Sequence, residues 1–191
     1  MKKAFVPSEY ANFQDAFYTL NPWQNVTEFN LGGRLIPRSL VGSSKSAAAL
    51  TDALKAIAAN GGITAGVSMD VSRPPLVPNS ANPEWRKSLF LAFLGIPYNR
   101  LDFAANIAAQ KVVTDVLLPK LEALTPGGGA YLNEADINHP NWQQVFYGVN
   151  YRALLAIKRK YDPAGIFWGL KTVGSEAWEQ TTDGRLCKSG K

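Results

Sequence analysis

The stretch from Ser43 to Val71 reads SSKSAAALTDALKAIAANGGITAGVSMDV, and it sets the expected fold. Its first part predicts a helix over 44–59, because two serines precede a run with helical apolar spacing and an Asn-Gly-Gly turn ends it. The apolar positions of this helix are Ala47, Leu50, Leu54 and Ile57. Residues 63–71 then alternate apolar with small or polar side chains, which predicts a strand with one buried face. A helix packed on a sheet is therefore expected.

A second strand is expected over 85–94, where the side chains from 88 onward are nearly all apolar. Such a strand is typical of the centre of a sheet, and the Pro-rich stretch 73–83 before it predicts a loop. Residues 102–124 fit helical spacing, with a kink or restart at Pro119, because proline interrupts the hydrogen bonds of a helix interior.

The C-terminal part combines short elements. Residues 125–129 predict a loop, residues 130–133 a short strand, and the stretch before Asp162-Pro163 a helix that ends there. Helices and strands do not alternate strictly along the chain. The expected class is therefore α+β, with a mostly antiparallel sheet covered by helices and a C-terminal extension of helices and strands.

Length and composition exclude several kinds of protein. With 191 residues, 46% of them hydrophobic, the chain can bury a core without disulfides or metals, so a single domain over 1–191 is expected. The lone Cys187 cannot form an internal disulfide, and no Cys/His spacing predicts a metal site. No signal peptide or membrane-length apolar stretch appears, so we expect the chain as written to be cytoplasmic and to bind no membrane.

The net charge of +5 invites a nucleic-acid interpretation, but the distribution of charge opposes it. The densest basic run, Lys158-Arg159-Lys160, belongs to an amphipathic helix and is best explained as its solvated face. Triad hydrolysis is also not expected, because His139 is the only histidine and no serine has a nucleophile-elbow motif around it. The glycines at 127–129 lack the Lys-Ser/Thr pair of a phosphate-binding loop.

Several motifs follow one another in a fixed order between residues 131 and 163. They are Tyr131-Leu132-Asn133-Glu134-Ala135-Asp136, Asn141-Trp142, Tyr147-Gly148-Val149-Asn150-Tyr151 and Lys158-Arg159-Lys160-Tyr161-Asp162-Pro163. This series resembles the C-terminal signature of fungal berberine-bridge-like FAD-linked oxidoreductases. The resemblance extends from about residue 30 to the C-terminus, and it implies a substrate-domain segment over about 30–125 and a berberine-bridge-like segment over 126–191.

The resemblance implies roles for particular residues. In that family the cofactor is FAD, and Tyr131 and Asn133 match the Tyr-x-Asn element beside the flavin, with Tyr131 the candidate base and Asn150 a further flavin contact. A positioned phenol can exchange a proton with a substrate, and an amide can satisfy donors and acceptors on the flavin edge. The alternatives are structural: Tyr131 as a half-buried packing residue and Asn150 as the cap of the helix that follows it.

The sequence departs from the family because nothing before residue 30 resembles a flavin-binding domain. We therefore expect this chain alone not to hold FAD tightly, and we expect a flavin-domain partner or a homodimer to cover the apolar surface left exposed. Three functions remain open: the substrate pocket of a flavoenzyme that oxidises a small hydrophobic natural product, a flavin-independent isomerase, dehydratase or cyclase, or a catalytically silent binding subunit. For the second, Tyr131, Glu134 and Asp136 are the candidate catalytic groups.

Overall fold

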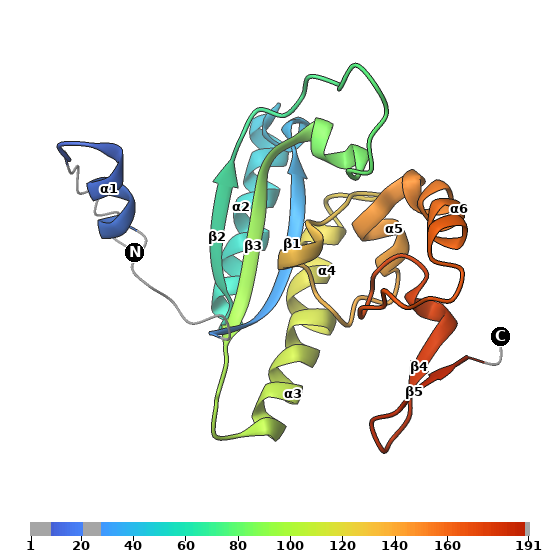
Figure 1. Ribbon diagram of the computed structural model, residues 1–191. Helices are drawn as coiled ribbons and strands as arrows, with labels where there is room; N and C mark the ends of the chain where they lie inside the picture. Colours follow the sequence, from blue (N-terminus) through green and yellow to red (C-terminus); the bar gives the residue numbers. More distant parts are fainter. Residues whose placement is uncertain (1–8, 21–27, 190–191) are drawn as a thin grey trace.

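A three-stranded antiparallel sheet forms the centre of the protein, as the computed structural model in Figure 1 shows; it describes residues 9–20 and 28–189. The order is β1-β3-β2, with β1 at Phe29–Pro37, β2 at Ile63–Ser68 and β3 at Ser88–Pro97. The central position expected for β3 is confirmed. Its start lies later than expected, because Pro83–Lys87 forms a 3-10 turn (η2) in which Asn82 accepts a hydrogen bond from the Glu84 amide.

Helices cover one face of this sheet. Helix α2 spans Ser44–Ala59 as expected, and the Ser43 hydroxyl caps it by accepting the Ser46 amide hydrogen bond at 3.1 Å. A short 3-10 turn, η1 at Arg38–Val41, connects β1 to it. The main core lies between α2, the second helical run and the sheet, and its buried members are Ile36, Leu50, Ile57, Ala92, Leu94, Val113, Leu117, Leu118 and Leu121.

The second helical run restarts near Pro119, as the sequence predicts. It consists of α3 at Phe103–Val112, a π-helical turn (η3) at Val113–Leu117, and α4 at Leu118–Glu122. Pro119 stands in the first turn of α4, where its missing N–H costs nothing, and the wider π turn before it accommodates the proline ring. The restart keeps Leu117, Leu118 and Leu121 fully buried against the sheet.

The second face of the sheet is largely apolar and partly open. By the strand register, Ile63, Ala65 and Val67 of β2 lie opposite Gly95, Phe93 and Leu91 of β3. The prediction that β2 has one buried face is wrong, because every residue of β2 is exposed, and the strand ends at Ser68 rather than at residue 71. As an edge strand it gains cover from only one neighbour, and its helix-facing positions Thr64, Gly66 and Ser68 carry too little apolar surface to attract α2.

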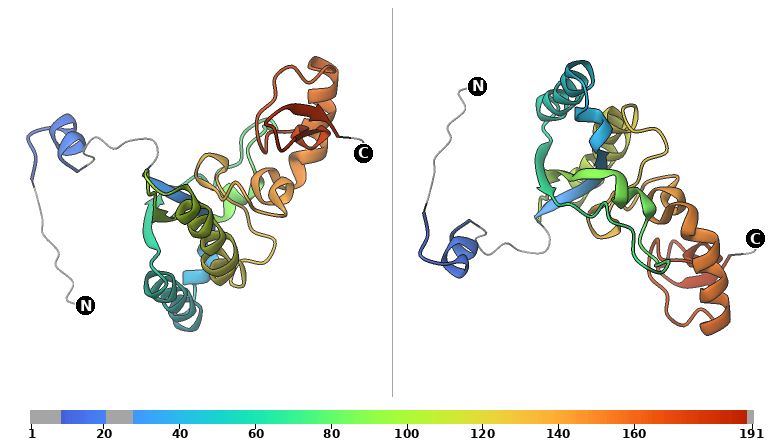
Figure 2. Two further views of the ribbon diagram at one scale, coloured as in Figure 1. Left: turned by 90° about the horizontal axis from the view of Figure 1, so that it is seen from below. Right: turned by 90° about the horizontal axis from the view of Figure 1, so that it is seen from above.

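The C-terminal segment lies to one side of the sheet and its helices (Figure 2). It contains α5 at Trp142–Tyr147, η5 at Gly148–Asn150, α6 at Tyr151–Tyr161, η6 at Ser175–Ala177 and the hairpin of β4 (Trp178–Gln180) and β5 (Leu186–Lys188). A second core of Ala130, Trp142, Val145 and Phe146 joins it to the preceding loop. The expected α+β class is confirmed, whereas the division at about residue 125 stays a prediction.

One further helix, α1 at Phe13–Leu20, was not expected from the sequence and lies apart from the sheet in Figures 1 and 2. Within the ranges 9–20 and 28–189, no helix is both long and apolar enough to cross a membrane. In the same ranges, no group of three or more His, Cys, Asp or Glu residues is placed to bind a metal ion.

Candidate functional site

The segment that carries Tyr131 and Asn133 crosses β1 on the sheet face opposite the helices. Its backbone comes so close to the strand that a Cβ placed on Gly33 would lie 2.6 Å from the carbonyl oxygen of Glu134. Leu35 and Ala130 each add one backbone hydrogen bond, to Gly129 and Val145 respectively. The expected strand at 130–133 is wrong, because after these two bonds the chain turns into a 3-10 turn, η4, at Leu132–Glu134.

Tyr131 and Asn133 form a direct pair. The Asn133 amide (Nδ2) donates a hydrogen bond to the Tyr131 phenol oxygen at 2.6 Å. The ring of Tyr131 is half-buried and meets the Trp85 ring edge-on, with centroids 5.6 Å apart. This packing fixes the ring plane, while the amide hydrogen bond orients the phenol oxygen. The arrangement suits a phenol that exchanges a proton.

The other two candidate catalytic groups differ from Tyr131 in their surroundings. Asp136 is buried. One of its carboxylate oxygens accepts from the Thr114 hydroxyl at 2.7 Å, and the other accepts from the backbone N–H of Asn138 at 2.9 Å. The first bond holds the loop against the π turn of the second helical run, and the second closes a turn within the loop. Glu134 is half-buried and follows Tyr131 closely in the chain. Glu134 lies in η4 and Tyr131 is the N-cap residue of that turn, whereas Asp136 attaches the loop to Thr114.

Asn150 precedes α6, but its side chain does not cap that helix. Instead its amide donates to the carbonyl oxygens of Asn79, at 3.3 Å, and Ala81, at 2.8 Å. The capping interpretation of Asn150 is therefore wrong for the side chain. The residue attaches the C-terminal segment to the loop before η2, and Trp85 of η2 touches Tyr131. The stretch 79–85 therefore contacts Asn150 near its beginning and Tyr131 at its end.

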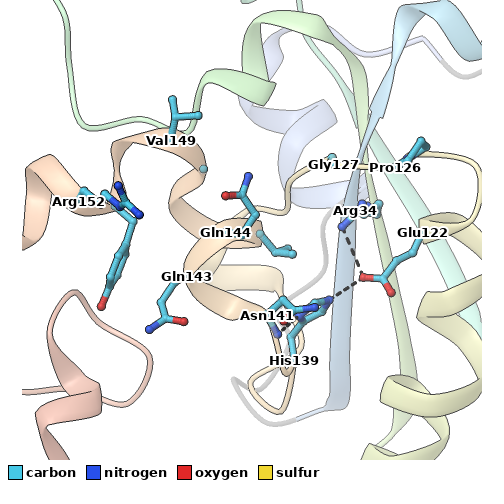
Figure 3. Close-up of a pocket in the computed structure, with 14 residues that line it drawn as sticks. Arg34, Glu122, Pro126, Gly127, His139, Asn141, Gln143, Gln144, Val149 and Arg152 are labelled. Carbon is cyan, nitrogen blue, oxygen red and sulfur yellow. Dashed lines mark hydrogen bonds and ion pairs between the residues drawn. The ribbon is translucent and has the colours of Figure 1, made fainter.

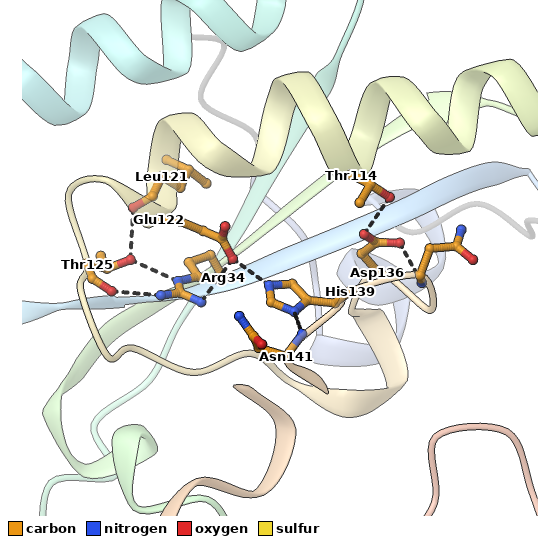
Figure 4. Close-up of polar contacts among 9 residues, drawn as sticks. Arg34, Thr114, Leu121, Glu122, Thr125, Asp136, His139 and Asn141 are labelled. Carbon is orange, nitrogen blue, oxygen red and sulfur yellow. Dashed lines mark hydrogen bonds and ion pairs between the residues drawn. The ribbon is translucent and has the colours of Figure 1, made fainter. Parts of the chain in front are cut away.

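The sequence did not reveal a buried polar cluster formed by Arg34, Glu122 and His139 (Figure 4). The His139 Nε2 atom lies 2.6 Å from Oε1 of Glu122, and the same oxygen lies 3.5 Å from NH1 of Arg34. Arg34 also donates to the hydroxyl and the carbonyl oxygen of Thr125. His139 ends a turn, in which its backbone N–H donates to the Asp136 carbonyl, and it is buried. The available signal was a single arginine in the otherwise apolar or neutral strand β1, which requires a buried partner.

Burial and pairing shift the pKa values of this cluster. Burial lowers the pKa of the Arg34 guanidinium, and the negative charges of Glu122 and Glu84 oppose that shift. The His139 hydrogen bond is the largest cause that holds the pKa of Glu122 below its ordinary value, with burial opposing it. The lowered pKa of Glu122 favours its ionised form, and an arginine side chain stays protonated in proteins, so the two form an ion pair.

A cavity of about 990 Å³ lies between this cluster and the C-terminal helices (Figure 3). Polar side chains from both sides line it, among them Arg34, Glu122, His139, Gln144 and Arg152. Tyr131 and Asn133 do not line it. The cavity and the Tyr131 pair are therefore separate features, and the cavity contains no nucleophile with an adjacent base.

Comparisons with known proteins agree with this geometry. Residues 130–172 match the family described as berberine and berberine like. The chain is 41% identical to the FAD-linked oxidoreductase sor8 of Hypocrea jecorina over 97% of this chain but only 32% of that protein. The crystal structure of the VAO-type flavoprotein MtVAO615 of Myceliophthora thermophila gives a TM-score of 0.82 and 36% identity over 93% of this chain and 34% of that one. MtVAO713 from the same organism gives 0.78 and 27%, over 95% and 33%.

The proteins that this chain matches are flavin-linked oxidoreductases. More narrowly, the chain is homologous to a part of the berberine-bridge-like FAD-linked oxidoreductases, and it spans about a third of the length of the relatives it matches. The resemblance inferred from the ordered motifs is thus confirmed. The family match begins at Ala130 and includes Tyr131, Asn133 and Asn150, although the roles of these residues stay predictions.

The two parts of FAD place different demands on a protein. A diphosphate needs backbone N–H groups at a helix N-terminus or an open glycine loop. The loop 126–129 instead leads into an extended segment, and a Cβ on Gly128 would already lie 2.9 Å from the Thr125 carbonyl oxygen. A flavin ring needs an apolar face with polar groups at its edge, which the open sheet face and Asn133 offer. The loop 126–129 therefore does not fit the diphosphate, whereas the open sheet face and Asn133 fit the ring.

Proposed function

We propose that this chain supplies the substrate-side domain of a FAD-linked oxidoreductase that acts on a small hydrophobic natural product. The observation that carries the proposal is the Tyr131–Asn133 pair beside an open apolar sheet face. A flavin at that face would accept the two electrons of the oxidation. Tyr131, as the phenolate, would take the proton that the substrate loses, and the Asn133 amide would donate its hydrogen bond to the same oxygen.

The partner of this chain is a flavin-bearing domain, in the same polypeptide or in a separate one. Two features support it: the relatives are about three times as long as the part of them that this chain matches, and the loop 126–129 does not fit a diphosphate. Ile63 and Val67 are 47% and 52% exposed. We expect the flavin-bearing domain to cover these two side chains and so to exclude water from the flavin. A homodimer that covers the same face is the alternative partner.

A flavin-independent isomerase or cyclase is the second candidate function. Its catalytic groups are Tyr131 and Glu134, because both oxygens of Asp136 are engaged by Thr114 and Asn138. A silent binding subunit is the third, and it needs none of these groups. The three candidate functions differ in whether the purified protein carries a yellow flavin and in whether it converts a substrate.

Absorbance and turnover together test the proposal. The chain is co-expressed with the flavin-bearing two thirds of a relative such as sor8, and the purified complex is examined at the flavin bands and assayed for oxidation of small phenols and alcohols. We expect a yellow complex whose turnover falls by about 10² to 10⁴-fold in Tyr131→Phe. The matched control Tyr161→Phe, at a tyrosine 74% exposed on α6, should keep full turnover. Turnover by the colourless chain alone would contradict the redox proposal and favour the second candidate.

A further inference from the structure

The loop 125–141, between α4 and α5, carries the candidate pair near its middle and is anchored where it begins. Arg34 of β1 donates from Nε to the Thr125 hydroxyl at 2.8 Å and from NH2 to the Thr125 carbonyl oxygen at 2.7 Å. The Arg34 side chain is only 4% exposed. A buried guanidinium with two bonds to one residue fixes both the position and the direction in which the chain leaves α4.

The loop is anchored again where it ends. His139 accepts the Asn141 backbone N–H at its Nδ1 atom, 3.1 Å away, so Nδ1 carries no proton in this arrangement. The ring proton therefore lies on Nε2, which donates to Glu122 at 2.6 Å. The histidine thus ties the start of α5 to the end of α4, and its ring is 8% exposed.

Glu122 connects the two anchors, since its Oε1 atom accepts from His139 and lies 3.5 Å from NH1 of Arg34 (Figure 4). Removal of one member leaves the others buried with unmatched charge or unmatched hydrogen-bonding groups, which costs more than the bond itself. Between the anchors, the Gly129 carbonyl accepts from the Leu35 amide and the Ala130 amide donates to the Val145 carbonyl before the site, and Asp136 is attached to Thr114 after it.

We propose that Arg34, Glu122 and His139 are positioning residues that hold the loop 125–141 so that Tyr131 and Asn133 keep their hydrogen-bonding geometry above β1. The catalytic consequence rests on the proposed function, whereas the order of the loop does not. The contact between Gly33 and the Glu134 carbonyl leaves little space, so a small shift of either anchor displaces the pair.

Hydrogen exchange of the intact chain tests the positioning role. In His139→Ala and Glu122→Gln, amides of residues 126–141 should exchange about tenfold faster or more, while peptides from β1 and β3 change by less than about threefold. Asp52→Asn is the matched control, because it removes a carboxylate from an exposed pair with Lys55 on α2. It should change neither region. Equal acceleration across the whole chain, or none in the loop, would overturn the proposal.

A second readout reports the pair itself. The side-chain amide signals of Asn133 in a nitrogen-15 NMR spectrum are identified by their displacement in Tyr131→Phe. His139→Ala should move them toward the Tyr131→Phe position, and His139→Gln, which restores a donor to Glu122, should return them toward wild type. Should His139→Ala fold poorly, Thr125→Val removes the hydroxyl that accepts from Arg34 and donates to the Leu121 carbonyl, keeps the carbonyl bond to Arg34, and should cause a smaller displacement in the same direction. Unmoved Asn133 signals in these folded variants would refute positioning.

This design separates the two proposals. If Tyr131→Phe leaves the turnover of the flavin complex unchanged, the proposed function fails, while the exchange and NMR results still decide whether the three residues position the loop. If turnover depends on Tyr131 but the Asn133 signals ignore His139, only the positioning inference fails.

Discussion

Gly33→Ala is the substitution that most directly tests how the site segment packs on the sheet. An ideal Cβ at Gly33 would lie 2.6 Å from the Glu134 carbonyl oxygen. That distance is about 0.8 Å shorter than 3.4 Å, where ordinary van der Waals contact begins. The obstacle is backbone, so no rotamer change relieves it, and either η4 or β1 must move. Such overpacking costs about 1–3 kcal/mol. For a chain of this size, a loss of about 2 kcal/mol lowers the Tm by roughly 4–8 °C.

The assay is urea unfolding followed by circular dichroism, with Gly66→Ala as the control in the same sheet. A Cβ at Gly66 meets first the Phe90 side chain, Cδ2 at 3.2 Å, which can shift by the small amount required. Its free energy of unfolding should change by less than about 1 kcal/mol, because alanine also restricts the unfolded chain. The Asn133 side-chain amide signals should move in Gly33→Ala only. Equal stability of the two variants would refute the close approach of η4 to β1.

Two further predictions concern pH. The His139 hydrogen bond holds the pKa of Glu122 below its ordinary value of 4.5. The bond therefore stabilises the fold at pH values above 4.5, and this stabilisation is lost as the pH falls through the lower pKa of the folded state. In urea unfolding between about pH 6 and about pH 3, Glu122→Gln should therefore show a smaller loss of stability toward acid than wild type. Burial and the hydrogen bond to Glu176 raise the pKa of Tyr151 to about 12. The stabilisation that the neutral Tyr151 side chain gives the folded state is therefore complete below pH 10.0 and is lost as the pH rises through about 12. Absorbance titration of Glu176→Gln should show one tyrosine ionising earlier than in wild type, and an unchanged titration would contradict the Tyr151–Glu176 bond.

Elements with local signals could be predicted from the sequence almost to the residue. Helix α2 begins after Ser43 and ends at Asn60 because a serine cap and an Asn-Gly turn act within a few residues of the helix. The restart near Pro119 is equally local. The exposure of β2 was not predictable in this way, because burial of a strand depends on what lies across its face.

The candidate site shows the same division. Tyr131 and Asn133 are two residues apart, so one short motif identifies both, and their hydrogen bond is a local contact. Arg34, Glu122 and His139 are separated by 88 and 17 positions, and no single motif contains all three. Only the three-dimensional structure brings them together. Sequence reasoning therefore found the chemical groups and missed the residues that support them.

This separation bears on what the berberine-like match represents. The matched region, 130–172, contains Tyr131, Asn133 and His139, but the partners that anchor its loop, Arg34 and Glu122, lie outside it. Cut away from β1 and α4, the region would lose the carboxylate that accepts the His139 hydrogen bond and the strand against which η4 packs. A piece of 43 residues also buries too little apolar surface to compensate for the loss. The sheet, the helical run and the matched region are therefore one folding unit as far as the Tyr131 site is concerned, and the site belongs to their junction.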